Sequence, residues 1–361
     1  MSETLIFLLI VFIKMIIVAF GLMIIFAFTT VWERKLAGFI QDRLGPNRIG
    51  PYGMFQVVAD GLKMFLKEEV FPNRAHRALY LVAPVIFLTP ALMIFAVIPF
   101  GDTIRLFGRD ISLVVVPDIN IGILFIFAFA SLGIYGVITA GWASNNKFSL
   151  HAGLRSAAQL ISYEVVLLLS ALPPLMAAGS LNLSKVVEYQ SGLYLGFLPR
   201  WNLLIMLPGA IIFFVAMLAE LNRLPFDMVE CEQELVAGVH LEYSSMKFAA
   251  FYMGEYMNML TACMLFTCLF LGGWLYPGYH SLRADDPNLA AAIGIIVFGI
   301  KLCIMISFII QLRWTLPRFR YDQLMNLCWK RLLPITLVWI FLVALGILLF
   351  KPAVSVIAAG L

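Results

Sequence analysis

The chain alternates between long apolar stretches and short polar loops. A helix needs about 20 mainly apolar residues to cross a bilayer. Eight stretches meet that length: 5–31, 79–100, 119–142, 154–178, 202–219, 247–273, 289–312 and 333–358. Hydrophobic residues make up 62% of the 361 residues and charged residues 13%, against about 45–50% and 25% in soluble domains. We therefore predict an all-α membrane protein, a single integral-membrane domain over 1–361 with eight transmembrane helices.

The lysines and arginines predict the orientation of these helices. The loops after the odd-numbered helices, with their flanks, carry 17 of these cations, and the loops after the even-numbered helices carry five. Cytoplasmic loops are enriched in Lys and Arg. The odd-numbered loops are therefore expected on the cytoplasmic side, and both termini on the periplasmic side.

The first cytoplasmic loop contains an amphipathic segment at 54–69. Its apolar side chains fall on one stripe at helical spacing: Phe55, Val58, Leu62, Phe65 and Leu66. A helix of this length is too short to span a bilayer. We expect it to lie in the membrane interface or to pack on the helix bundle.

An acidic segment at 220–242 separates two apolar stretches. It contains one cation, Arg223, and six carboxylates: Glu220, Asp227, Glu230, Glu232, Glu234 and Glu242. Pro225 suits the first position of a short helix, with Asp227 in its first turn. Asp227 and Glu232 taken alone are typical of a solvated helix end. As a set, crowded carboxylates repel, and some pKa values should rise toward neutrality, which favours proton uptake and release. By the predicted orientation this segment lies on the cytoplasmic face.

Two further carboxylates, Glu164 and Glu255, lie inside the apolar stretches 154–178 and 247–273. Acids within a membrane are costly and often mark proton or ion paths. The alternative is a neutral, hydrogen-bonded acid that stabilises helix packing. Because both acids lie toward the same half as the acidic segment, we expect a polar track from that loop to the membrane centre.

The sequence offers no redox centre of its own. The five cysteines are scattered without a CxxC pair, which disfavours an iron–sulfur cluster, a zinc site or a disulfide framework, and we expect no bound metal. No histidine lies inside an apolar stretch, which disfavours a buried haem. A dinucleotide fingerprint is also missing, so we expect no bound flavin. A diffusible, lipid-soluble redox partner remains possible.

The first loop places a second group of charges where the first helix ends: Glu33, Arg34, Arg48 and Asp60. Ordinary cytoplasmic anchoring by positive charge explains much of this loop. The adjacent pair Glu33 and Arg34 is compatible with either anchoring or a site.

Five long motifs make the chain recognisable. They are WERKLAGFIQDRLGPNRIGPYG (32–53), ADGLKMFLKEE (59–69), WASNNKFSLHAGLRSAAQLISYEV (142–165), ELNRLPFDMVECEQELVAGVHLEYSSMKFAAFYMGEY (220–256) and RWTLPRFRYDQLMNLCWKRLLP (313–334). The chain resembles the quinone-chamber membrane subunit of respiratory complex I, known as the H subunit in the bacterial NADH:quinone oxidoreductase. The resemblance covers nearly the whole chain.

This resemblance implies a membrane subunit of a proton-translocating enzyme that reduces ubiquinone or menaquinone with electrons from NADH. It implies a proton or coupling path through glutamates, and these match Glu164, Glu220, Glu230, Glu232, Glu234, Glu242 and Glu255. It implies a quinone chamber near the positions that match Glu33, Arg34, Arg48 and Asp60.

The resemblance also implies partners and a location. The partners are the quinone-site and iron–sulfur subunits of the hydrophilic arm, small membrane subunits leading to antiporter-like subunits, and membrane lipids, with no nucleic acid. The location is the bacterial plasma membrane.

One departure and two alternatives stay open. Some relatives carry an acid inside the third helix, whereas 119–142 has none and Ser131 is among its few polar residues. A related subunit of an energy-converting membrane-bound hydrogenase would couple another electron acceptor to ion movement, and nickel-ligating cysteines in its partner would identify it. A free-standing channel or transporter would be active when purified alone.

Overall fold

The computed structural model describes residues 3–106, 109–116, 119–194, 198–229 and 232–358. The helices are α1 (Glu3–Ile40), α2 (Gln56–Leu66), α3 (Arg77–Met93), α4 (Gly122–Ala143), α5 (Lys147–Ala178), α6 (Leu183–Tyr189), α7 (Asn202–Ile205), α8 (Leu207–Glu220), α9 (Glu232–Leu235), α10 (Ser245–Phe270), α11 (Tyr279–Asp285), α12 (Pro287–Thr315), α13 (Tyr321–Asn326) and α14 (Leu333–Ala358). Two short antiparallel hairpins join them: β1 (Thr103–Leu106) with β2 (Arg109–Ser112), and β3 (Leu193–Tyr194) with β4 (Leu198–Pro199).

Within the described residues, six helical segments are long and apolar enough to cross a membrane: Ile10–Ile40, Arg77–Ala96, Gly122–Ala143, Lys147–Ala178, Pro287–Thr315 and Tyr321–Leu349. They coincide with six of the eight predicted spans and identify an integral membrane protein. The other two predicted spans correspond to α8, which has only 14 residues, and α10, which carries Glu255 and Asn258. Whether α8 and α10 also cross the bilayer stays a prediction.

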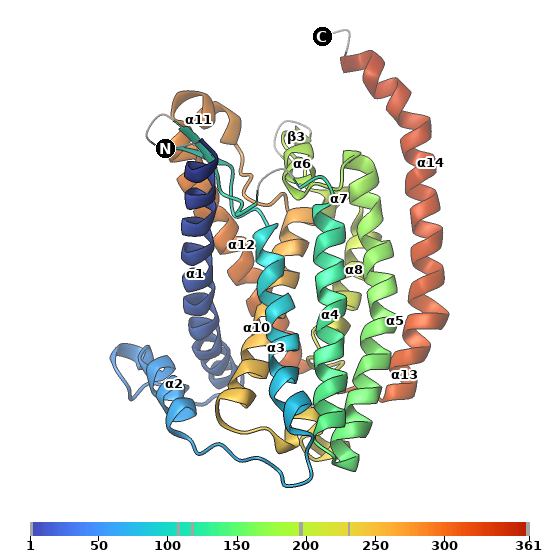
Figure 1. The fold of residues 1–361 in the computed structure, drawn as a ribbon. Helices are drawn as coiled ribbons and strands as arrows, with labels where there is room; N and C mark the ends of the chain where they lie inside the picture. Colours follow the sequence, from blue (N-terminus) through green and yellow to red (C-terminus); the bar gives the residue numbers. More distant parts are fainter. Residues whose placement is uncertain (1–2, 107–108, 117–118, 195–197, 230–231, 359–361) are drawn as a thin grey trace.

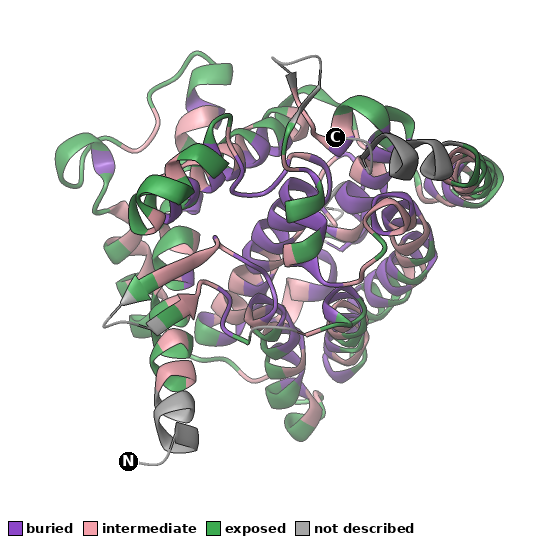
Figure 2. Cartoon of the chain, turned by 90° about the horizontal axis from the view of Figure 1, so that it is seen from above, coloured by how far each residue is buried: buried purple, intermediate pink, exposed green. Residues whose placement is uncertain are grey.

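The helices form a bundle whose core lies along α10. Tyr256, Met257, Leu260 and Met264 on α10 are at most 1% exposed. Figure 2 shows buried residues gathered in the middle of the bundle and exposed residues on its outer helices. Many outward-facing side chains are large and apolar, such as Phe20, which is 65% exposed. In water such surfaces would be unfavourable, and lipid is the solvent that suits them.

Both ends of the chain lie at one end of the bundle, and α2 and α13 lie at the other (Figure 1). This arrangement agrees with the prediction that the loops after the odd-numbered helices all lie at one end of the bundle. The side of the membrane that each end faces stays a prediction.

Several helix boundaries differ from those predicted by hydropathy. α1 continues to Ile40, so that Glu33 and Arg34 are on the helix. α5 starts at Lys147, because Asn146 accepts a hydrogen bond from the Phe148 backbone and caps the helix. The stretch 202–219 is broken at Met206 into α7 and α8.

α2 confirms a helix inside 54–69, with an apolar stripe that does not pack on this chain. The stripe residues are 56–83% exposed: Phe55, Val58, Leu62, Phe65 and Leu66. The exposure disfavours packing on the bundle, and placement in the membrane interface stays a prediction.

A partly buried lysine of α12 holds the chain that follows α10. Lys301 Nζ donates hydrogen bonds to the carbonyl oxygens of Leu271, Gly273 and Leu275 at 2.7, 2.8 and 2.9 Å. These carbonyls lie just beyond the end of α10, where backbone acceptors lack helical partners. The ammonium of Lys301 therefore serves as a structural cap for the end of α10, which explains why a charge lies within the apolar helix α12.

We expect Gly136→Ala to destabilise the bundle, because α3 and α4 touch there. A Cβ at Gly136 would lie 2.7–2.8 Å from Phe87 Cβ and backbone atoms, whereas a Cβ at Gly133 meets nothing within 4 Å. Gly136→Ala should lower the free energy of unfolding in detergent micelles by about 1–3 kcal/mol. Gly133→Ala on the same helix is the control and should not. Equal effects would contradict close packing at Gly136.

Candidate functional site

A buried cluster of charges surrounds Glu33 on α1. Its carboxylate is 4% exposed. Arg223 Nη1 lies 2.8 Å from Oε2, and the Tyr256 hydroxyl donates to the same oxygen at 2.6 Å. Arg313 Nη1 donates to Oε1. Because Arg223, Tyr256 and Arg313 come from the acidic segment, α10 and α12, one carboxylate joins four parts of the fold.

Arg223 is fixed by more than its ion pair. Its guanidinium lies 4.2 Å from the centre of the Tyr256 ring. Burial is the largest single influence and opposes its charge, but Glu33, Tyr256 and Glu255 together outweigh burial and raise the pKa of Arg223. Arg223 therefore remains a cation next to the carboxylate.

A cleft of about 730 Å³ opens beside this cluster. Its lining comes from the end of α1, the loop that follows, α2, α10 and α12: Glu33, Arg34, Ala37, Arg43, Leu44, Gly45, Pro46, Asn47, Arg48, Gln56, Tyr252, Tyr256, Arg313 and Trp314. Three of the four predicted chamber residues thus line one cleft. The fourth, Asp60, does not line the cleft but contacts two residues that do, Arg34 at 2.6 Å and Gln56 at 3.0 Å.

The carboxylates of the acidic segment are not a crowded, unpaired group. Asp227 pairs with Arg318 at 2.8 Å, Glu234 pairs with Arg155 at 2.6 Å, and Glu242 accepts from Asn146 at 2.8 Å. Counting only Arg223 as a counter-ion is therefore wrong, because the cations come from other parts of the chain. Glu230 lies outside the described residues, and for Glu232 the description covers the backbone of α9 alone.

The predicted helix beginning at Pro225 is also wrong. Residues 224–229 are not helical, and α9 covers only Glu232–Leu235. The Pro225 carbonyl accepts from Phe319 and the Val229 carbonyl from Val239, so tertiary contacts use this backbone. Asp227 is 3% exposed, and it is not a solvated helix-end acid.

Glu255 and Glu220 face one small enclosed cavity. His240 Nε2 lies 3.1 Å from Glu255 Oε1. The cavity is lined by Glu220, His240, Glu255 and Asn258, among others. Glu220 Oε2 is enclosed and, among the described residues, has no hydrogen-bond partner.

Glu164 lies deepest along the bundle, 17 residues beyond Lys147 in the 32-residue α5. Ser131 on α4 donates a hydrogen bond to its Oε1 at 2.5 Å. Glu164 interacts electrostatically with Glu220 on the neighbouring α8. Ser131, one of the few polar residues of 119–142, therefore contacts the predicted path residue Glu164 directly.

Several residues of this site are not predicted from the sequence. The sequence leaves Arg313 open between membrane anchoring and a site and places Tyr256 next to Glu255, whereas both side chains bind Glu33. From the sequence, His240 is only one of the histidines that lie outside the apolar stretches, which disfavours a buried haem. Its position inside the acidic segment is the signal that could have identified it.

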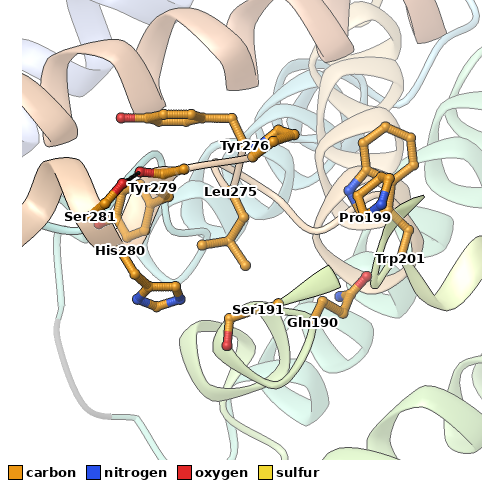
Figure 3. Close-up of a pocket in the computed structure, with 12 residues that line it drawn as sticks. Gln190, Ser191, Pro199, Trp201, Leu275, Tyr276, Tyr279, His280 and Ser281 are labelled. Atoms are coloured by element: carbon orange, nitrogen blue, oxygen red, sulfur yellow. Dashed lines mark hydrogen bonds between the residues drawn. The ribbon is translucent and has the colours of Figure 1, made fainter. Parts of the chain in front are cut away.

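A separate pocket of about 220 Å³ lies toward the other end of the bundle (Figure 3). It is lined by residues such as Gln190, Trp201, Tyr276 and His280. Nearby, the Tyr279 hydroxyl and Arg283 hold Asp102. This pocket contains none of the predicted site residues.

The described residues include no group of three or more His, Cys, Asp or Glu side chains placed to hold a metal ion. The chemistry available at the site is hydrogen bonding, charge stabilisation and proton transfer by carboxyl, imidazole, phenol and guanidinium groups.

Comparisons with known proteins agree with one another. A family model described as NADH dehydrogenase matches residues 13–344. The H subunit of the NADH-quinone oxidoreductase of Flavobacterium johnsoniae is 45% identical over 335 residues, covering 92% of this chain and 94% of that protein. The corresponding protein of Magnetococcus marinus is 45% identical over 326 residues, covering 90% and 88%. That of Vesicomyosocius okutanii is 44% identical over 347 residues, covering 96% and 92%.

Glu33→Gln should leave the buried charge of Arg223 without the carboxylate that pairs with it. Breaking a buried ion pair costs roughly 3–5 kcal/mol, and we expect a loss of that order in the free energy of unfolding in detergent micelles. Asp60→Asn is the matched control, because the side chains of Arg34 and Asp60 are 46% and 33% exposed and such pairs contribute at most about 1 kcal/mol. Comparable losses for both variants would contradict the special position of Glu33.

Proposed function

Because this chain belongs to the NADH dehydrogenase family, we propose that it is the H subunit of an NADH-quinone oxidoreductase and couples quinone reduction to proton transfer. The observation that carries this proposal is the cleft beside Glu33, in a bundle that also holds a small cavity lined by Glu220 and Glu255. The relatives from Flavobacterium johnsoniae, Flavobacterium psychrophilum and Vesicomyosocius okutanii are named as H subunits of this enzyme, so the hydrogenase alternative is not favoured.

The cleft beside Glu33 is proposed as part of the quinone chamber. Quinone carbonyl oxygens, and the negative charge that develops on them during reduction, suit the guanidinium and phenol donors in this lining. Arg34, Arg48, Arg313 and Tyr252 line the cleft. The exposed apolar stripe of α2 would lie in the membrane interface and guide the tail of ubiquinone or menaquinone. Electrons would come from an iron–sulfur subunit of the hydrophilic arm.

The coupling path is proposed to run from the chamber to the middle of the bundle through Glu255, Glu220 and Glu164. Arg223 links the chamber to the first carboxyl group of the path, since it pairs with Glu33 and also interacts electrostatically with Glu255. A change of charge on the quinone would alter the proton affinity of these coupled groups. Glu230, Glu232, Glu234 and Glu242 are proposed to belong to the path by family resemblance.

The proposed setting is the plasma membrane of a bacterium. The end of the bundle with α2 and α13 would face the cytoplasm and the hydrophilic arm, and both termini the periplasm. α8 and α10 would complete eight transmembrane helices in one integral-membrane domain. Small membrane subunits would continue the path toward antiporter-like subunits.

Glu164→Gln and Glu220→Gln should each lower proton translocation by the assembled enzyme in proteoliposomes. Glutamine keeps the shape but cannot carry a proton, and positioned acid–base groups contribute roughly 10²–10⁴-fold to proton-transfer steps. Glu188→Gln, at an exposed position on α6, is the control. Normal translocation in both path variants, with normal assembly, would rule out the proposed path.

A quinone with a photoreactive group on its ring should label the cleft. We expect modification in the segment 43–48 or at 33–37, and excess unmodified quinone should suppress it. Mass spectrometry of the digested enzyme gives the position. Labelling confined to the pocket near Trp201 and Tyr276 (Figure 3) would contradict the chamber assignment.

A further inference from the structure

The proposed path has a gap between Glu255 and Glu220. Both carboxyl groups line the same enclosed cavity, whose volume is about 10 Å³. This is close to the smallest space that holds one water molecule. Asn222, His240 and Asn258 also line it, so hydrogen-bonding groups surround the space on several sides.

The polarity of this cavity favours a bound water. Glu220 Oε2 is enclosed and lacks a hydrogen-bond partner among the described residues. An enclosed polar atom without a partner is unfavourable, whereas a water with two to four polar neighbours resolves it. Glu220, Glu255 and Asn258 supply such neighbours.

The imidazole of His240 is held in a fixed place at the edge of the cavity. Its Nε2 lies 3.1 Å from Glu255 Oε1. Its ring packs against the rings of Phe248 and Phe251, with centres 5.8 and 5.2 Å apart. Imidazole accepts and releases protons near neutral pH more readily than other side chains.

We infer that His240 and one water molecule in this cavity carry protons between Glu255 and Glu220, an inference that rests on the proposed function. The Glu255 O–H bond breaks as an N–H bond forms at His240 Nε2. The imidazolium then gives the proton on Nε2 to the water, and the water gives one of its protons to the carboxylate of Glu220. No electrons move in these steps, and His240 and the water return to their starting states.

The test is His240→Asn in the assembled enzyme in proteoliposomes. Asparagine can hydrogen-bond to Glu255 but cannot carry a proton. We expect proton translocation on the order of 10²-fold slower, in line with the loss of a positioned acid–base group. His280→Asn, in the pocket of Figure 3, is the control and should translocate normally. Normal translocation by His240→Asn would overturn the role of His240.

A second variant tests the water and remains informative if His240→Asn assembles poorly. Val229 lines the cavity, and Val229→Ile adds one methyl group that fills the space without changing a titratable group. In the infrared difference spectrum, the band of the bound water is identified by its shift in H₂¹⁸O. Slowed translocation together with the loss of this band in Val229→Ile supports the inference. Normal translocation with the water band lost overturns the role of the water, and a wild-type spectrum without that band overturns it too.

Glu220→Gln separates this inference from the proposed function. Slowed translocation in Glu220→Gln with normal translocation in His240→Asn would overturn the relay through His240 and leave the path standing. Normal translocation in both would remove the path and the relay together.

Discussion

Glu33 is held by two guanidinium groups and a phenol from three separate parts of the chain. A buried carboxylate without cations would be strongly unfavourable here, and so would two neighbouring cations without a carboxylate between them. Together they fix the end of α1 against α10, α12 and the acidic segment. The same contacts place Arg223 near Glu255 and form one wall of the cleft. The site and the beginning of the path therefore depend on this cluster.

Much of the bundle could be predicted from the sequence, because hydropathy and helix length are local properties. Six predicted spans coincide with six apolar helices. The boundaries were less predictable, since they depend on specific contacts. Asn146 caps α5 before its apolar stretch begins, and α1 continues beyond its apolar stretch to Ile40. The break at Met206 has no hydropathy signal, since the residues on both sides of it are apolar.

Three of the four predicted chamber residues line one cleft, but the ion pairs within the site were not predictable from the sequence. Glu33 meets Arg313 across 280 residues of sequence, and Asp227 meets Arg318 across 91. No local pattern reveals such partners, which is why the sequence alone predicts unpaired acids and a helix at Pro225. Counting charges within 220–242 alone therefore makes these acids look more crowded and less paired than they are. Glu220 and Glu255, both identified from the sequence, do share an enclosed cavity.

Quinone reduction is proposed to change the protonation of enclosed carboxyl groups, and every step of the coupling path depends on that change. Infrared difference spectroscopy of the assembled enzyme, before and after quinone reduction, measures it most directly through the carboxylic C=O stretching region. We predict a band that shifts in D₂O and is lost in Glu220→Gln. A spectrum without any carboxylic change, or one that Glu220→Gln leaves unaltered, would contradict the coupling path.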